Sequence, residues 1–316
     1  METIKNNARV KWQNIELERE PFTFAFKRFD SKCEANFYIG VNQNDKKCIL
    51  HDLDNVRIDF HGFEKTNLKA YKSDNYLILE LIGNDDYFEL FLDLSCAIFS
   101  TIKDISIQQR SAEIFKEMIL KWSEFFSNKK NDKLGEKEVI GLFGEIYVLK
   151  TLIIKNEIDI NDILSAWRGP YDSCRDFEFA SREIEVKTIK DDAESVGISS
   201  EFQLSIEGDI EVDLRVLKVR QEESGHSLRQ IFEDTLNEIM QKKGEVEMFY
   251  SALYQKVNIK DLAEYDNYCF AINSDITYSV NSVDFPKITS ENIIGGISNV
   301  KYKIMLSKIE SFIKYK

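Results

Sequence analysis

Two short segments, residues 176–179 and 183–188, constrain the fold more than any other part of the chain. In both, apolar side chains alternate with ionisable ones, which is the period-2 pattern of β-strands. The connection between them, at Ser181 and Arg182, is short enough for a hairpin turn. With Glu178 opposite Glu185, and hence Asp176 opposite Lys187, the hairpin has one apolar face and one face that carries these four ionisable side chains.

Carboxylates crowded on that second face repel one another. Cross-strand neighbours lie about 5 Å apart, so the arrangement is destabilising unless a cation or a proton intervenes. Carboxylate oxygens suit Mg²⁺ or Mn²⁺, and magnesium is usually held by one or two carboxylates and by water. We therefore predict a metal site made by Asp176 and Glu185, with Lys187 placed to position a water molecule or to neutralise a phosphate. The alternative is an exposed hairpin with one solvated face.

A predicted helix over residues 139–149 carries another unusual carboxylate. Glu145 shares a helix face with Leu142 and Val148. An unpaired carboxylate there is costly, so a cation, a metal-bound water or a base should satisfy Glu145. Gly141 and Gly144 are unfavourable inside a helix, which predicts close packing against its backbone. The alternative is a Glu that reaches solvent from the edge of an amphipathic helix.

In this order, the motifs resemble the PD-(D/E)XK superfamily of Mg²⁺-dependent nucleases. The chain is most similar to the bacterial "PD-(D/E)XK motif proteins" found near restriction and phage-defence genes. The resemblance covers about residues 105–310, and the segments that carry it are 141–145 (GLFGE), 167–170 (WRGP), 176–177 (DF), 185–188 (EVKT), 199–204 (SSEFQL), 278–280 (YSV), 285–286 (FP) and 300–302 (VKY).

The resemblance implies an α/β (α+β) fold with a restriction-endonuclease-like mixed sheet flanked by helices. Carried over by position, it makes Asp176 and Glu185 the metal ligands and Lys187 the catalytic lysine. Glu145 becomes the acidic residue of the first core helix. Gln203 falls where some members of the superfamily place an active-site glutamine.

Two features near this motif bear on the prediction. Ser199 or Ser200 can cap a short helix, which would carry Gln203. Arg175 precedes Asp176 where the name of the motif has proline. That position varies widely within the superfamily, so metal binding stays a hypothesis, and a degenerate site stays the alternative.

The architecture is expected to change near residue 100. Before it, short alternating runs separated by turn residues predict an antiparallel β-rich domain, with strands near 22–26, 36–41, 56–60, 76–81 and 87–91. After it, apolar residues between Ile107 and Phe125 recur at helical spacing. We therefore expect an N-terminal β-rich domain over 1–100 and a catalytic domain over 101–316.

Further elements are predicted after the motif. Residues 210–219 alternate as a strand, and Ser227 opens an amphipathic helix. Three later segments, 269–272, 276–280 and 300–305, are predicted strands that extend or flank the catalytic sheet.

The formal net charge of −13, from 42 basic and 55 acidic residues, is the chief argument against a nucleic-acid substrate, and it also predicts weak non-specific binding. Proteins that bind phosphate backbones usually display a basic face. A local basic groove can still coexist with an acidic remainder. Its candidate residues are Lys129, Lys130, Lys133, Arg168, Arg175, Lys187 and Lys190.

Cysteine usage and hydropathy indicate an intracellular protein. The 5 cysteines are widely separated and form no C-x-x-C pair, so neither a disulfide framework nor a zinc site is indicated. The N-terminus lacks a hydrophobic signal region, and no apolar run approaches the ~20 residues of a membrane span. We expect a cytoplasmic protein that has no membrane partner.

Residues and resemblance together predict Mg²⁺- or Mn²⁺-dependent hydrolysis of phosphodiester bonds in DNA. The resemblance alone implies a restriction or phage-defence system, in which the chain can have partner subunits. One alternative is a non-catalytic subunit that keeps the nuclease fold and binds a partner ATPase or nuclease. Another is hydrolysis of RNA or of a small phosphorylated metabolite at the same site.

Overall fold

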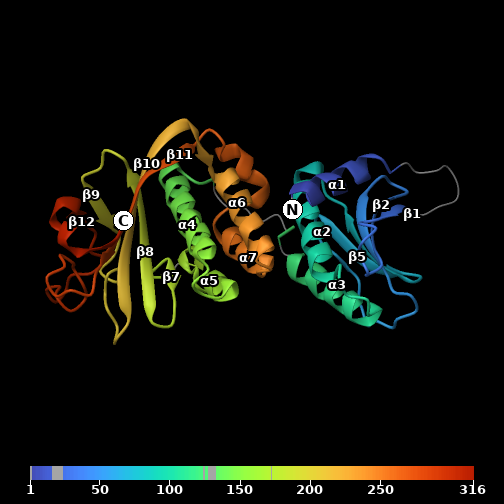
Figure 1. Ribbon diagram of the computed structural model, residues 1–316, viewed down its shortest axis with the longest axis horizontal. Helices are drawn as coiled ribbons and strands as arrows, with labels where there is room; N and C mark the ends of the chain where they lie inside the picture. Colours follow the sequence, from blue (N-terminus) through green and yellow to red (C-terminus); the bar gives the residue numbers. More distant parts are fainter. Residues whose placement is uncertain (1, 16–23, 124, 127–132, 172) are drawn as a thin grey trace. The chain divides into compact units, whose positions relative to one another are not determined.

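The computed structural model describes residues 2–15, 24–123, 125–126, 133–171 and 173–316. The chain divides into two compact units, Met1–Lys130 and Asn131–Lys316, and each is described by itself (Figure 1). The division follows the helical segment that begins near residue 107, whereas the expected boundary lay near residue 100. The helix Gln108–Trp122 therefore belongs to the first unit.

The first unit contains a six-stranded antiparallel sheet. Its strand order is β1 (Phe24–Arg28), β2 (Phe37–Asn42), β3 (Lys47–Asp52), β6 (Tyr76–Leu81), β5 (Leu68–Ser73) and β4 (Phe63–Glu64). Every neighbouring pair is antiparallel. The predicted N-terminal antiparallel β-rich sheet is thus confirmed. Residues 22 and 23 of the first predicted strand lie outside the described residues.

Three helices cover one face of this sheet, namely α1 (Glu2–Gln13), α2 (Phe88–Ile102) and α3 (Gln108–Trp122) (Figure 1). Aromatic rings make the contact. Phe99 of α2 stacks on Phe29, with ring centroids 4.8 Å apart, and Phe115 of α3 meets Phe37 at 6.0 Å. Apolar side chains of sheet and helices therefore share one core.

Two strand predictions in this unit were wrong. Residues 87–91 end the 3₁₀ helix η1 (Asp85–Tyr87) and begin α2. A short, mostly apolar run such as this one fits a buried helix as well as a strand, and the length of the element separates the two. Residues 56–60 form no strand. They follow Asp54 and Asn55, which have φ of 44° and 66° and reverse the chain.

The second unit contains a five-stranded mixed sheet. Its order is β13 (Ile313–Tyr315), β11 (Cys269–Ser279), β10 (Glu211–Ser227), β8 (Arg182–Lys190) and β7 (Phe177–Glu178). Strands β8 and β10 are parallel, and the other pairs are antiparallel. The predicted mixed sheet flanked by helices is confirmed. The segments 269–272 and 276–280, predicted as two strands, form the single strand β11.

Four helices lie on one side of this sheet, namely α4 (Glu136–Lys155), α5 (Ile160–Ala166), α6 (Leu228–Gln241) and α7 (Val246–Lys256) (Figure 1). The predicted helix around Glu145 is α4. Ser227 caps α6 as predicted, since its Oγ accepts a hydrogen bond from Gln230 N and its own N–H donates to Gln230 Oε1. Phe143 of α4 packs on Phe270 of β11 at a centroid distance of 5.2 Å.

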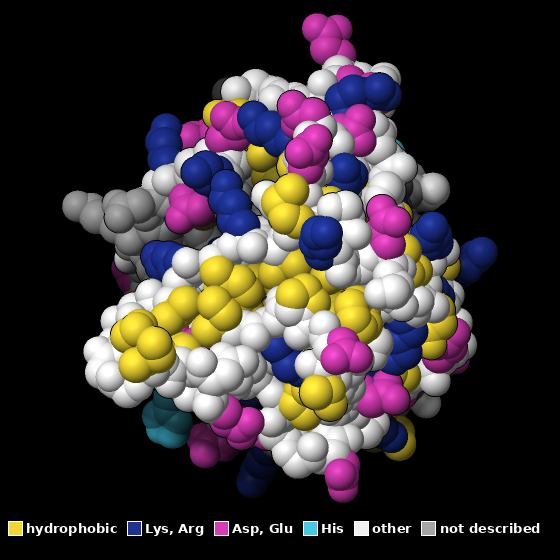
Figure 2. Space-filling view, turned by 90° about the vertical axis from the view of Figure 1, so that its left-hand side faces the viewer, with side chains coloured by type: hydrophobic (Ala, Val, Ile, Leu, Met, Phe, Trp, Pro, Cys, Tyr) yellow, Lys and Arg dark blue, Asp and Glu magenta, His cyan; other side chains and the backbone are white. Residues whose placement is uncertain are grey.

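A second layer covers the opposite face. It contains a two-stranded sheet, β9 (Ser195–Ile198) with β12 (Tyr302–Met305), and the short 3₁₀ helices η4 (Leu306–Lys308) and η5 (Glu310–Phe312). Val196 and Ile304 join Leu214 and Val216 of β10 in one buried cluster. The outer surface of this layer carries a band of apolar side chains, with charged residues on both sides of it (Figure 2).

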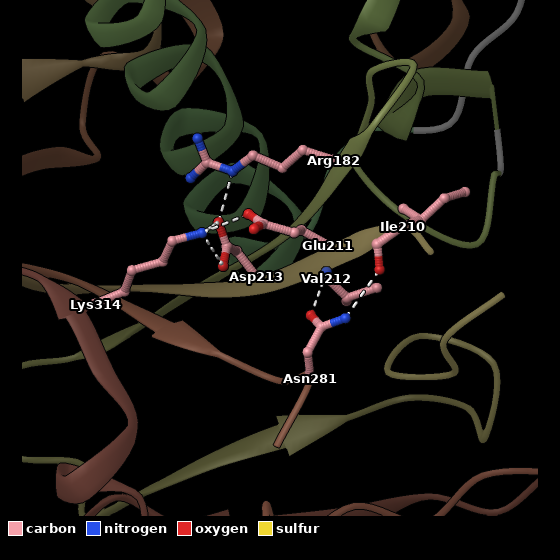
Figure 3. A network of polar contacts seen from close by, with 7 residues as sticks. All are labelled: Arg182, Ile210, Glu211, Val212, Asp213, Asn281 and Lys314. Carbon is pink, nitrogen blue, oxygen red and sulfur yellow. Dashed lines mark hydrogen bonds and ion pairs between the residues drawn. The ribbon is translucent and has the colours of Figure 1, made fainter. Parts of the chain in front are cut away.

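Buried polar contacts hold the last strand to the sheet (Figure 3). The carboxylate of Asp213, on β10, is buried and accepts a hydrogen bond from Arg182 Nε at 2.6 Å. Lys314 Nζ, on β13, lies 3.4 Å from Asp213 Oδ1 and 2.8 Å from Glu211 Oε2. Two cations thus offset a buried charge, and they join β8, β10 and β13.

Candidate active site

The predicted hairpin forms, but its register differs from the prediction. Phe177 lies opposite Ile184, and Glu178 lies opposite Glu183. The expected pairings of Glu178 with Glu185 and of Asp176 with Lys187 were therefore wrong. The turn is tighter and earlier, since Phe179 N donates to Arg182 O at 2.8 Å. This moves the partner strand by two residues, and an even shift keeps each side chain on its predicted face.

The new register brings Asp176 next to Glu185 across the ladder. Asp176 Oδ2 accepts a hydrogen bond from the backbone N–H of Val186 at 2.8 Å. The Asp176 carbonyl accepts from Arg168 N at 2.7 Å and from Gly169 N at 3.1 Å. These contacts hold the carboxylate at the sheet edge, between β8 and the start of η2 (Gly169–Tyr171).

Glu145 of α4 faces the same small space as Asp176. A Cβ on Gly169 would lie 2.5 Å from Glu145 Oε2 and 2.7 Å from Asp176 Oδ1, so a larger residue there would displace these carboxylate oxygens. Trp167 Nε1 donates to Glu145 Oε2 at 3.0 Å. The predicted need of Glu145 for a partner is therefore met in part by a neutral indole, which the sequence argument did not foresee.

Glu185 is the most buried carboxylate of the site, with 1% of its surface exposed. Lys187 Nζ lies 2.5 Å from its Oε1. Its Oε2 is buried and has no hydrogen-bond partner. Buried polar atoms are almost always satisfied in folded proteins, so an orphaned carboxylate oxygen indicates a missing ligand or proton. We call Glu145, Asp176 and Glu185 the carboxylate cluster.

The pKa values of the carboxylate cluster are all raised. That of Glu185 rises to about 8, through burial and then the charge of Asp176, against the lowering effect of Lys187. Burial, followed by the charge of Asp176, raises the pKa of Glu145 well above its usual value. Burial also raises the pKa of Asp176, although the Val186 N–H and the charge of Lys187 oppose it. The cluster therefore favours a bound cation or proton.

Lys256, the last residue of α7, contributes positive charge that the sequence analysis missed. Its charge lowers the pKa of both Glu145 and Asp176. No motif spacing marks Lys256 in the sequence, because it lies far along the chain from the Glu-x-Lys strand. The packing of α7 brings it there. Phe249 of that helix contacts the ring of Trp167, with a centroid distance of 5.8 Å.

Asp176 and Glu185 offer a hard cation two carboxylates from the protein. Within the described ranges, no group of three or more His, Cys, Asp or Glu side chains is arranged to hold a metal ion. Mg²⁺ commonly needs only one or two carboxylates, with water and substrate completing its shell. The unpartnered Oε2 of Glu185 beside Asp176 fits that requirement.

Gln203 lies on a turn, and the short helix predicted for it was wrong. Its Oε1 accepts from Ser199 N at 2.7 Å, and the neighbouring Glu201 accepts from Val300 N at 2.9 Å. These side-chain contacts compete with helical hydrogen bonds and favour the turn. Among the described hydrogen bonds, Gln203 makes none to the carboxylate cluster.

The candidate basic groove carries little net positive charge. Arg175 is buried and pairs with Glu183, and its guanidinium donates to the carbonyl of Ser205. The other described candidates also have acidic partners, in the pairs Lys133–Glu264, Arg168–Glu178, Lys187–Glu185 and Lys190–Glu136. Lys129 and Lys130 lie outside the described residues.

Close packing was predicted at both glycines of α4, and it occurs at one. A Cβ on Gly144 would lie 1.7 Å from Thr188 Oγ1, so this glycine lets α4 approach β8. A Cβ on Gly141 would meet nothing within 4 Å, so that part of the prediction was wrong. The 5 cysteines are free thiols, as expected.

The fold and the site define a class. A mixed sheet places an Asp beside a Glu-x-Lys strand, next to a helix that carries a Glu, which is the arrangement of the PD-(D/E)XK superfamily. The sequence model of a family described as "Putative PD-(D/E)XK family member, (DUF4420)" matches residues 9–307, and the chain belongs to that family. This membership indicates a nuclease-like, hydrolytic protein.

The other comparisons add no relative. No curated protein and no solved structure matches the chain. Within the described residues, the helices all fall short of the length and hydropathy that a bilayer span requires.

Proposed function

We propose that the protein hydrolyses phosphodiester bonds in DNA and depends on Mg²⁺ or Mn²⁺. The observation that carries this proposal is the buried Oε2 of Glu185, which has no partner and lies beside Asp176. Burial and the charge of Asp176 raise the pKa of Glu185, so these two carboxylates are poor structural elements when both are ionised. They are good ligands for a hard dication.

Asp176 and Glu185 would hold the metal. A metal bound there would lower the pKa of a water molecule and offset the charge that develops on the phosphate. The Val186 N–H fixes the orientation of Asp176. Lys187 shields Glu185 now and would neutralise a phosphate oxygen when substrate is bound.

Glu145 would hold a proton in this scheme. Burial and the charge of Asp176 raise its pKa well above the usual value, which favours the protonated form, and Trp167 fixes its carboxyl group beside Asp176. A proton held there is available to the leaving oxygen. Gln203 stays a predicted site residue, which would contact substrate from the neighbouring turn.

We further propose, from the family resemblance, that the activity serves restriction or phage defence in the cytoplasm. A partner subunit would bring the chain to DNA. The net charge of −13 and the paired basic residues near the site leave little attraction for a phosphate backbone, which supports this part of the proposal.

Calorimetry with Mn²⁺ and cleavage of plasmid DNA test the proposal together. The wild type should bind the metal and cut, and the Asp176→Asn, Glu185→Gln double variant should do neither. Glu207→Gln is the matched control, because it replaces an exposed carboxylate on a loop by a carboxamide. This variant should behave as wild type. Absence of both binding and cleavage in the wild type would contradict the proposal and favour the non-catalytic subunit.

A further inference from the structure

We propose that Phe202 is a stacking platform for an unpaired base, and that the substrate of this site is single-stranded DNA. This inference rests on the proposed function and names its substrate class. Phe202 is 50% exposed, although its neighbours Glu201 and Leu204 are buried. Glu201 is 5% exposed and Leu204 is fully buried, so a large aromatic ring points outward from a well-packed turn.

The turn that carries Phe202 is anchored on both sides. Glu201 accepts hydrogen bonds from Asn299 N at 3.2 Å and from Val300 N at 2.9 Å. Leu204 belongs to the buried cluster between β10 and the outer layer. A ring held in place before binding loses little conformational entropy when a ligand stacks on it.

Arg175 ties this turn to the carboxylate cluster. Its Nη2 lies 3.5 Å from the carbonyl oxygen of Phe202 and donates to the carbonyl of Ser205. Arg175 immediately precedes Asp176, and it is buried. The backbone at Phe202 is therefore linked, through the buried Arg175 side chain, to the residue that precedes a predicted metal ligand.

The neighbouring surface is apolar. Glu201 joins the turn to the loop before β12, on which Ile294 is 77% exposed and Ile297 is 55% exposed. An apolar band crosses this end of the second unit (Figure 2). Such a surface suits the faces of bases, because stacking on an aromatic ring needs no positive charge.

The charge balance selects a single strand over a duplex. Duplex DNA keeps its bases stacked inside and is bound chiefly through its phosphates. The chain has a net charge of −13, and Arg168, Arg175 and Lys187 near the site each pair with an acidic residue. Affinity must then come from bases that are free to leave the stack, and these exist in single strands.

Fluorescence anisotropy tests the proposal with labelled oligothymidylate and a duplex of equal length. The measurement is made in EDTA on the Asp176→Asn background, so neither metal nor cleavage contributes. Phe202→Leu should weaken binding of the single strand about tenfold and leave duplex binding unchanged. Phe202→Trp should keep the affinity, and oligothymidylate should quench the introduced indole. Tyr315→Leu is the matched control, a 56% exposed ring on β13 at the opposite sheet edge, and should have no effect.

Equal affinity of Phe202→Leu and its parent for the single strand would overturn the proposal. So would an equal loss for single strand and duplex, or tighter binding of the duplex by the parent protein. If the hydrolytic function itself is wrong, the calorimetry will show no metal binding. The anisotropy measurement needs neither metal nor cleavage, so its result can still be interpreted.

Discussion

At the scale of single residues, the site is defined by unfavourable electrostatics. Glu185 is buried beside Asp176 and keeps one oxygen without a partner. Such an arrangement lowers the stability of the metal-free protein when both groups are ionised. Gly169 and Trp167 complete the recess, one by leaving space and the other by donating to Glu145. The residue types of Asp176, Glu185 and Lys187 were predictable, whereas the role of Gly169 depends on two side chains that meet it in space.

The raised pKa of Glu185 predicts a stability change with pH. Its pKa rises from the usual 4.5 to about 8 on folding, so the folded state binds a proton that the unfolded state releases within this window. The free energy of unfolding in EDTA should therefore fall as pH rises from 4.5 to 8. Glu185→Gln should remove this contribution and raise the stability near pH 8 by roughly 2 kcal/mol or more.

Urea denaturation of wild type and variant, in EDTA at about pH 5 and about pH 8, measures this effect. Glu207→Gln is a suitable control, since that carboxylate is exposed and lies on a loop. An identical pH profile for wild type and Glu185→Gln would show that the Glu185 proton does not affect folding.

At the scale of elements, helix α4 and strand β8 place the two sides of the site. Their separation is set at Gly144, where a Cβ would collide with Thr188. Alternation predicted the faces of β8 and the apolar stripe of α4, because both follow from local geometry. The register of β7 on β8 was not predictable, since a turn that starts one residue earlier satisfies the same alternation.

The two glycines of α4 provide a matched test of this packing. Gly144→Ala should destabilise the protein by about 1–3 kcal/mol, because the added methyl group forces α4 away from β8. Gly141→Ala should stabilise it by about 1 kcal/mol, because it gains helix propensity without a new contact. Chemical denaturation of both variants checks the signs. Destabilisation by both changes, to the same degree, would contradict the close approach at Gly144.

At the scale of the whole molecule, the chain contains two units with opposite predicted responses to pH. In the first unit, His51 is buried, and its Nε2 lies 2.9 Å from Ser111 Oγ. Burial lowers the pKa of His51 from 6.5 to about 4. The unfolded state then binds an extra proton within this window, so the stability of this unit should fall as pH drops from 6.5 to 4. The second unit carries Glu185, whose effect has the opposite sign.

His51→Gln should remove the loss of stability of the first unit at acid pH. The expected change in the free energy of unfolding is roughly 2–3 kcal/mol. In a Trp167→Phe background the remaining tryptophans, Trp12 and Trp122, report on the first unit alone. Their fluorescence during urea unfolding at several pH values gives the measurement. His61→Gln is the control, with a side chain 93% exposed, and should keep the wild-type profile. A flat profile in the wild type would rule out the predicted role of His51.

The sequence by itself determined the types of residue at the site, the faces on which they lie and the mixed α/β architecture. Alternation, helical spacing and capping are local, so they can be recognised without contacts between distant segments. Only the tertiary structure decided the register of Asp176 with Glu185, the contact of Trp167 with Glu145, the approach of Lys256 and the anchoring of Phe202 through Arg175. Each of these depends on segments that are far apart in the chain and meet only when helices and sheet pack together.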